Sequence, residues 1–374
     1  MNLSFLRPLY DRRGDWVTVY LDATRTGENA DHELQLRWQA LRSKLRDQGA
    51  DQATVDAVAV AVAEHPHQPG PYGLAIFANA GEVVRLETLS AAPAIDEARY
   101  GPLPHTMPLL AQRGEDVPYV RVLADRTGAD LEGLSVGGAP RRRTVTGSET
   151  FPLHKVNVGG WSHRHYQLAV EEAWKRNATD VAAAAVDLAD AVGAEVIVVG
   201  GDVRAVQTFT GRLPQRWRDR LVSTDAGSRH AGADDNTLDD VTIQAIAEVA
   251  ESHVREVVDR YGAQRGADQA GIGLADVVTR LQRGQVDTVL LANDPSSTDM
   301  LWIAPGDPTL IAVDERLLRE SGVDDPQRVR ADDALVRAAS GTGANLALVS
   351  PGEVPLQHGV GAVLRYADAS IAPS

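Results

Sequence analysis

The sequence predicts an α/β protein built from three domains. Helix-period and strand-period apolar patterns alternate through most of its 374 residues, a length that suits two or three domains of about 100–150 residues each. Two stretches lack such a pattern, the proline-spaced residues 102–118 and the polar residues 223–236, and both are typical of linkers. The predicted domains are therefore residues 1–117, whose role the sequence leaves open, 118–224 and 237–374.

The first domain combines strands with two helices. Its opening strand is rich in Val and Tyr. Apolar residues then recur at helical spacing in two segments, and Pro66 and Pro69 end the second. The turn residues Asn79-Ala80-Gly81 join the last two strands. The predicted elements are strand 16–22, helices 31–46 and 52–63, and strands 72–78 and 82–89.

The second domain begins with a hairpin and continues as helix, strand and helix. Asp125-Arg126-Thr127-Gly128 is a turn sequence between two apolar strands. A long helical pattern ends at Gly193, which is suited to a helix C-terminus, and a buried strand follows. The predicted elements are strands 119–124, 129–136 and 142–147, a helix from about 165 to 192, strand 195–200, a short helix after Asp202 and an amphipathic segment 214–221 with Trp217.

The third domain again alternates helices and strands, which indicates α/β structure. Asn236 or Thr237 can cap its first helix. The acidic residues Asp324, Asp325, Asp332 and Asp333 lie around a predicted helix start, where the helix dipole favours negative charge. The predicted elements are helices 238–261, 274–283 and 326–339, strands 288–292, 301–304 and 345–349, and a closing segment 359–366.

Composition excludes several classes of protein. The chain has no cysteine, so disulfides, thiolate metal sites and cysteine nucleophiles are excluded, and a reducing, cytoplasmic location is expected. Residues 1–12 lack a signal-peptide pattern, and no apolar stretch is long enough to span a membrane. The formal charge of −15 argues against a protein that coats DNA or binds an anionic membrane over its whole surface.

A local reversal of charge marks the segment 141–176. It contains seven Lys and Arg residues against three acids, a local charge of +4 within a chain of −15. The pair Gly159-Gly160 lies near the middle of this segment, before the long helix. A glycine hinge that carries positive charge suits a loop that approaches a polyanion, so a nucleic-acid partner touched by one protrusion is expected.

The same features occur in a recognisable order. A hairpin with an Asp-x-x-Gly turn is followed by basic residues, the Gly-Gly pair, a long helix of mixed charge and an apolar strand that ends in glycines. Two further segments match in the third domain, 273–290 and 359–366, the latter reading Gly-Val-Gly-Ala-Val-Leu-Arg-Tyr. Over residues 119–367 the sequence thus resembles the archaeo-eukaryotic class I release factors and their relative Pelota. It is most similar to the bacterial branch that includes the Balon-type ribosome hibernation factors.

This resemblance implies a ribonuclease-H-like central domain, an L7Ae-like C-terminal domain and a cytoplasmic, ribosome-bound role without a cofactor. In release factors the loop reads Gly-Gly-Gln-Ser, and the Gln orients the water that hydrolyses peptidyl-tRNA. Here Trp161 occupies the Gln position, and an indole has one N–H donor and no acceptor. We therefore expect A-site occupancy, as in hibernation or ribosome protection, without hydrolysis, and no catalytic residue.

The resemblance also implies partners and contact residues. The partners would be rRNA at the A site and peptidyl-transferase centre, with elongation factor Tu as a candidate carrier. Trp161 could stack on a nucleobase. The residues expected to contact rRNA are His154, Lys155, Gly159, Gly160, Trp161, Ser162, His163, Arg164 and His165, supported by Arg141, Arg142 and Arg143.

Alternative interpretations remain open at this stage. The chain could be a release or rescue factor in which Trp161, His163 or Gln167 replaces the glutamine, or a regulatory protein that binds another protein. Trp161 could equally pack on its own domain. His154, His163 and His165 could hold a metal, and Asp125 could belong to a nuclease-type metal site. No carboxylate pattern supports either metal site, and turn chemistry alone explains Asp125.

Overall fold

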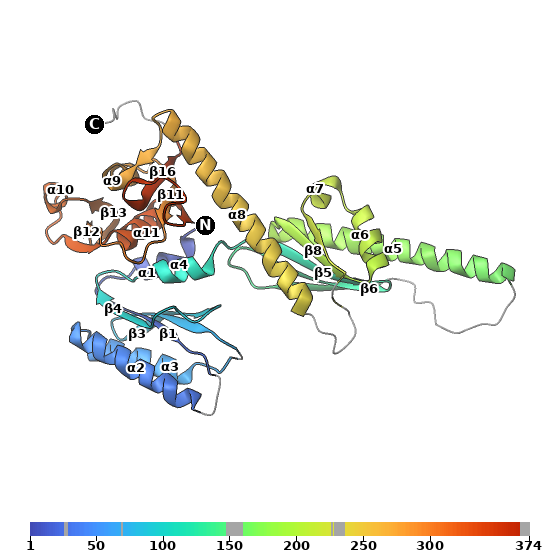
Figure 1. Cartoon of the computed structure of the whole chain (residues 1–374), viewed down its shortest axis with the longest axis horizontal. Helices are drawn as coiled ribbons and strands as arrows, with labels where there is room; N and C mark the ends of the chain where they lie inside the picture. The colour runs from blue at the N-terminus through green and yellow to red at the C-terminus, as the bar shows by residue number, and fades with distance from the viewer. Residues whose placement is uncertain (26–28, 69, 147–159, 226, 228–235, 367–374) are drawn as a thin grey trace. The chain divides into compact units, whose positions relative to one another are not determined.

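The computed structural model describes residues 1–25, 29–68, 70–146, 160–225, 227 and 236–366, with only the backbone described for 160–173 and 236. The chain divides into two compact units. Unit 1 combines Met1–Glu115 with Val254–Ser374, and unit 2 is Asp116–His253. Both are mixed α/β structures, which confirms the predicted fold class (Figure 1). The three-domain division stays a prediction.

The N-terminal part of unit 1 is an antiparallel sheet in the order β3-β2-β1-β4. Helices α2 and α3 cover one face, where Trp38 and Leu41 pack against Val19 and Ile76. The opposite face carries Tyr20 and joins a second core. The elements are η1 (Ser4–Leu6), α1 (Arg7–Tyr10), β1 (Trp16–Asp22), α2 (Ala30–Asp47), α3 (Gln52–Glu64), β2 (Gly73–Asn79), β3 (Glu82–Leu89) and β4 (Glu97–Gly101).

The predicted linker at 102–118 is wrong, because this segment is part of the core. It contains α4 (Met107–Arg113), whose Met107 and Leu110 are buried. The Tyr20 hydroxyl donates to the His105 carbonyl at 2.7 Å and accepts from the Leu109 N–H at 3.2 Å. Pro108 lies in the first turn of α4, where proline costs no hydrogen bond, so the prolines that indicated a linker mark a helix start.

The C-terminal part of unit 1 has two small sheets, in the orders β10-β16-β11-β15 and β13-β12-β14. Strand β11 is parallel to β15 and antiparallel to β16. The elements are α8 (Asn236–Gly266), which begins in unit 2, β10 (Gly271–Ile272), α9 (Gly273–Gln282), β11 (Val286–Ala292), β12 (Met300–Ala304), β13 (Asp307–Ala312), α10 (Glu315–Glu320), β14 (Gln327–Arg330), α11 (Ala331–Thr342), β15 (Asn345–Val349), η2 (Gln357–Gly359) and β16 (Val360–Leu364).

One predicted helix of this part is wrong over its first turn. Residues 326–339 were expected to be helical throughout, but 327–330 form strand β14, and the helix begins at Ala331. Val329 pairs with Leu301 of β12. The edge of β12 offers backbone hydrogen bonds to residues 327–330, and these bonds outweigh the helix propensity of that segment. A local periodicity cannot reveal such partners.

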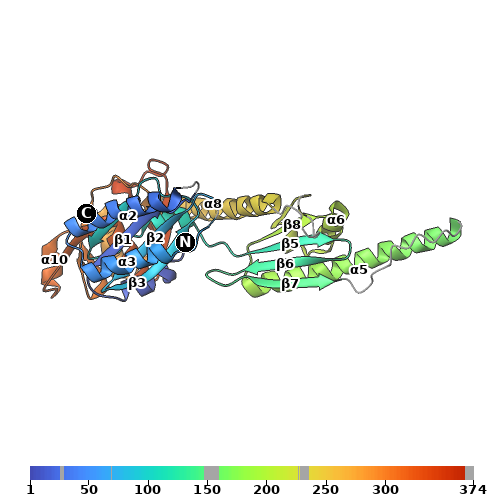
Figure 2. The same cartoon turned by 90° about the horizontal axis from the view of Figure 1, so that it is seen from below.

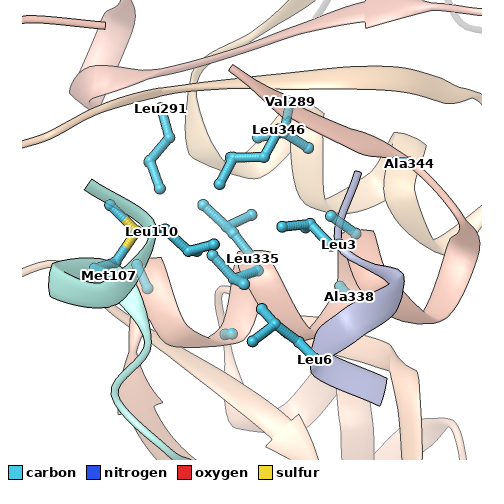
Figure 3. Packing of buried hydrophobic residues seen from close by; sticks show 14 of the residues in the cluster. Leu3, Leu6, Met107, Leu110, Val289, Leu291, Leu335, Ala338, Ala344 and Leu346 are labelled. Atoms are coloured by element: carbon cyan, nitrogen blue, oxygen red, sulfur yellow. The ribbon is translucent and has the colours of Figure 1, made fainter. Parts of the chain in front are cut away.

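The core of unit 1 joins the two ends of the chain. Leu335 of α11 lies between Leu3 and Leu6 near the N-terminus and Met107 and Leu110 of α4 (Figure 3). The N-terminal ammonium also donates to the carbonyl of Leu346 at 2.6 Å. This packing makes the first ten residues an integral part of the C-terminal half of the unit.

A buried polar pair accompanies this core. His105 Nδ1 lies 2.9 Å from an Asp333 carboxylate oxygen, and each side chain is less than one tenth exposed. Burial raises the pKa of Asp333, and the hydrogen bond from His105 opposes that rise. Asp332 and Asp333 do lie in the first turn of α11, as the helix-dipole interpretation requires. Asp333, however, also fastens α11 to the segment before α4.

Unit 2 is a five-stranded sheet in the order β7-β6-β5-β8-β9, with β5, β8 and β9 parallel. Helices α5 and α6 pack on one face through Ala185 and Phe209. The first half of α8 packs on the other face through Leu238. The elements are β5 (Tyr119–Asp125), β6 (Gly128–Leu134), β7 (Arg141–Thr146), α5 (Gly160–Val192), β8 (Val196–Gly201), α6 (Val203–Arg212), α7 (Gln215–Arg218) and β9 (Leu221–Ser223).

Two ion pairs hold α8 on its face of the unit 2 sheet. Arg121 of β5 pairs with Asp239, and His253 Nε2 lies 2.7 Å from a carboxylate oxygen of Glu195. The sheet thus has a helix layer on each face, as the alternation of helix and strand predicts. In the part of the chain that is described, no helix is long and apolar enough to cross a membrane.

Replacing Leu335 by Ala should lower the free energy of unfolding by about 2–5 kcal/mol, because the side chain is fully buried at the centre of the shared core. Urea unfolding measures this loss. Leu317→Ala on α10, where the side chain is 49% exposed, is the matched control and should change stability by less than about 0.5 kcal/mol. Equal losses in the two variants would contradict the assignment of this core.

Replacing Asp333 by Ala should cost about 3 kcal/mol of stability, because it leaves His105 buried without its partner. Asp333→Asn should cost less than half as much, because the amide oxygen can still accept a hydrogen bond from His105 Nδ1. Thermal unfolding of both variants at pH 7.5 measures the difference. Equal losses would show that the pair depends on the carboxylate charge rather than on the hydrogen bond.

Candidate functional site

The hairpin of unit 2 is fixed by Asp125. One Asp125 carboxylate oxygen accepts from the N–H and the hydroxyl of Thr127, both at 2.6 Å, and from the Gly128 N–H at 2.9 Å. This is the turn role that the sequence offers for Asp125. Among the described side chains, the group of His and acidic residues close enough to share a metal does not include it.

Two positions of the release-factor-like pattern, Gly128 and Gly201, require glycine because the backbone of a neighbouring strand lies too close for a side chain. A Cβ on Gly128 would lie 2.0 Å from the carbonyl oxygen of Val145, and a Cβ on Gly201 would lie 2.0 Å from that of Ala124. Both residues also have positive φ, at +158° and +122°. The Asp-x-x-Gly turn and the glycine end of β8 are therefore structural features that bring four neighbouring strands of the sheet, β7, β6, β5 and β8, together.

The basic support residues lie on the edge strand β7. Arg142 donates to Glu132 of β6 at 2.6 Å, and Arg143 lies 3.9 Å from Asp187 of α5. The Arg141 side chain has no partner among the described residues. All three side chains are exposed. Charged residues also protect an edge strand from pairing with other chains, so this strand has a structural reason for its charge as well.

The predicted contact loop lies mostly outside the described residues. This applies to His154, Lys155 and Gly159. The backbone from Gly160 through His165, including Trp161, Ser162, His163 and Arg164, forms the first turns of α5. The helix therefore begins about five residues before the predicted start, since no helix breaker follows Gly160. Its N-terminal half extends beyond the sheet of unit 2 (Figure 2).

A second polar centre lies where β5 and β8 end. Arg126 pairs with Asp202 at 3.1 Å, and its guanidinium lies 4.8 Å from the centre of the Trp174 ring. Burial alone would raise the pKa of Asp202, but hydrogen bonds from Arg126 and from the N–H groups of Ala205 and Arg204 lower it. A small cavity of about 30 Å³ adjoins these residues. The carboxyl ends of parallel strands are where α/β sheets commonly bind ligands.

An arginine-rich face on α6 and α7 was not predicted from the sequence. Residues 203–220 contain five arginines and one acid, a local charge of +4. Buried Phe209, Leu213 and Trp217 anchor this segment, so its arginines face solvent. Arg216 pairs with Asp190 at 2.7 Å. A count of charge per segment would have found this face, whose arginines are Arg204, Arg212, Arg216, Arg218 and Arg220.

Residues 118–224 carry a small positive net charge, and the rest of the chain is strongly negative. Residues 118–224 carry fourteen Lys and Arg against twelve Asp and Glu, which is +2, so the remainder of the chain carries −17. The positive charge is concentrated on β7 and on α6–α7, at exposed positions. A surface of this kind is suited to a polyanionic partner.

Unit 1 holds a group that could suggest a metal. His105, Asp332 and Asp333 have ligand atoms within 4.8 Å of one another. Arg330, however, bonds both carboxylate oxygens of Asp332, at 3.0 and 2.6 Å, and His105 bonds Asp333. Both carboxylates therefore already have partners within the protein, and a cation would have to displace Arg330. A cavity of about 790 Å³ lies beside this group.

Comparisons with known proteins agree with the sequence motifs. Over 370 residues the chain is 31% identical to two uncharacterized Mycobacterium tuberculosis proteins, Rv2629 of strain H37Rv and MT2704 of strain CDC 1551. The match covers 98% of this chain and 97% of theirs.

Solved structures give looser matches. Archaeal translation termination factor aRF1 is 16% identical with a TM-score of 0.24, covering 97% of this chain and 96% of its own. Archaeoglobus fulgidus Pelota is 14% identical with a TM-score of 0.36, covering 97% and 92%. Ribosome-bound archaeal Pelota is 11% identical with a TM-score of 0.38, covering 98% and 94%. At these values the likeness says nothing about function.

The family model described as Bacterial archaeo-eukaryotic release factor family 2 matches residues 118–267. These residues include the hairpin, β7, the Gly-Gly pair, α5 and the arginine-rich face of α6–α7. With the full-length relatives, this match identifies the chain as a member of bacterial archaeo-eukaryotic release factor family 2 and as a release factor-like translation factor.

Proposed function

We propose that this protein occupies the vacant A site of idle ribosomes and protects them without hydrolysing peptidyl-tRNA. The observation that carries the proposal is Trp161, which follows Gly159-Gly160 at the position where the loop of the class I release factors has glutamine. Hydrolysis needs a side chain that both donates to and accepts from a water, and indole only donates. The loop keeps its hinge and its charge but lacks the catalytic amide.

Contact with rRNA in this proposal uses two exposed basic surfaces of unit 2. Arg141–Arg143 on β7 form one, to which the basic loop residues of the sequence would add, and the arginines of α6–α7 form the other. Guanidinium groups bind phosphate oxygens with two parallel hydrogen bonds, and each neutralised phosphate releases counterions. The acidic remainder would limit binding to nucleic acid elsewhere on the surface. Trp161 would stack on a nucleobase, with elongation factor Tu as the candidate carrier, in the cytoplasm.

Reversing the charge of the α6–α7 arginines tests the rRNA surface. The triple variant Arg212→Glu, Arg218→Glu and Arg220→Glu should lower ribosome affinity at least tenfold, because it replaces three phosphate contacts by repulsion. Cosedimentation with ribosomes from starved cells at low and moderate salt measures the affinity. The wild-type protein should lose affinity steeply as salt rises.

The matched control makes the same change of charge on unit 1. Arg46, Arg283 and Arg328 are exposed, and their replacement by Glu should leave ribosome binding within about twofold of wild type. Equal loss in both triple variants would show that only net charge matters. A wild-type protein that never enters ribosomal fractions, at low salt included, would end the proposal.

The absence of hydrolysis is tested with ribosomes that carry labelled peptidyl-tRNA. The wild-type protein should release no peptide above background, and Trp161→Ala should also release none, but should bind ribosomes about 5- to 100-fold more weakly through loss of one stacked base. Peptide release by the wild type would instead support the rescue-factor alternative, which the retained Gly159-Gly160-x-Ser162 pattern favours. Loss of that release in Trp161→Ala, His163→Ala or Gln167→Ala would then identify the residue that replaces the glutamine.

A further inference from the structure

A small cavity in unit 1 is lined by three arginines and by no acidic residue. Its volume is about 50 Å³, enough for several water molecules or one small oxyanion. Segments from both ends of the chain form its walls. The lining residues are Leu9, Tyr10, Arg12, Arg13, Gly14, Trp16, Pro102, Leu103, Ile303, Pro305, Gln327 and Arg337.

Arg337 of α11 is a buried cation without a carboxylate partner among the described residues. The residue is 3% exposed. Its Nη2 donates to the carbonyls of Ala304 and Pro305, both at 3.0 Å, while Nη1 is buried and has no hydrogen-bond partner in the described part of the chain. Asp307 acts on Arg337 only at longer range, because its carboxylate accepts from Thr309. An unpaired buried charge normally costs several kcal/mol, so a compensating anion is expected.

A second guanidinium, that of Arg13, lies beside the turn between β12 and β13. The Arg13 side chain has no partner among the described residues, and its Nη2 would lie 3.3 Å from a Cβ on Gly306. Gly306 directly follows Pro305, whose carbonyl holds Arg337. Two like charges therefore approach one turn, and no acid lines the cavity beside them. Arg12 is already paired with Glu82 at 2.7 Å.

We propose that this cavity binds a phosphate group between Arg13 and Arg337. The guanidinium fork matches the spacing of phosphate oxygens, and a bound dianion would offset both charges. Gln327 and the Tyr10 hydroxyl line the same cavity and can donate to the remaining oxygens. The phosphate would link the N-terminal segment to the turn between β12 and β13. The site is independent of the ribosome-binding surfaces, which lie on unit 2.

Thermal unfolding and calorimetric titration of the full chain with inorganic phosphate test the proposal. The melting temperature should rise with phosphate and not with chloride at equal ionic strength, because only the native state holds the site. A second arm uses a nucleoside monophosphate. Binding of both ligands identifies a phosphate monoester as the natural occupant, and binding of inorganic phosphate alone identifies the free ion. No rise with either means that water fills the cavity, which overturns the proposal.

Variants locate the binding. Arg13→Ala should weaken phosphate binding at least tenfold while leaving the melting temperature without phosphate unchanged, because its side chain is exposed. Arg337→Met should abolish binding, so its melting temperature should not respond to phosphate. Arg46→Ala, at an exposed site outside the cavity, is the control and should bind normally. Equal phosphate stabilisation of all three variants would place the ion elsewhere.

Discussion

The architecture of unit 1 depends on one contact between its two ends in sequence. The N-terminal segment packs against helix α11 of the C-terminal part through Leu3, Leu6 and Leu9. The N-terminal sheet has one face covered by its own helices and the other buried in the shared core. Burying that second face removes apolar surface which residues 1–115 alone would leave exposed to water. The pair His105–Asp333 and the turn that holds Arg337 both lie where these distant segments meet.

In unit 2 the apolar side chains lie between the sheet and its helices, and the charged side chains lie on the outer surface. Each face of its sheet is covered by helices, so its positive charge is left on the edge strand β7 and on the solvent side of α6–α7. Buried Leu213 and Trp217 fix the arginine-rich segment without using its charges. The buried apolar residues hold the backbone of this segment, so that its guanidinium groups are presented to solvent.

The residues of the hairpin and of β8 that resemble the release-factor motif have structural roles in this fold. Gly128, Gly201 and Asp125 have structural reasons in strand packing and turn geometry, and these hold for any function of the unit. These contacts account for the scaffold, and the proposed function rests instead on Trp161 of the sequence and on surface charge.

The sequence by itself determined the α/β class, the bounds of β1, β3 and β15, and the likeness to release factors, because periodicity and motif order are local properties of the chain. Only the tertiary structure decided that residues 102–118 belong to the core, that 327–330 form a strand, and that His105 pairs with Asp333, 228 positions away. Each of these depends on partners distant in sequence. A local pattern predicts which side chains lie on the apolar face of a helix or strand. The residues that pack against that face are determined only by the tertiary structure.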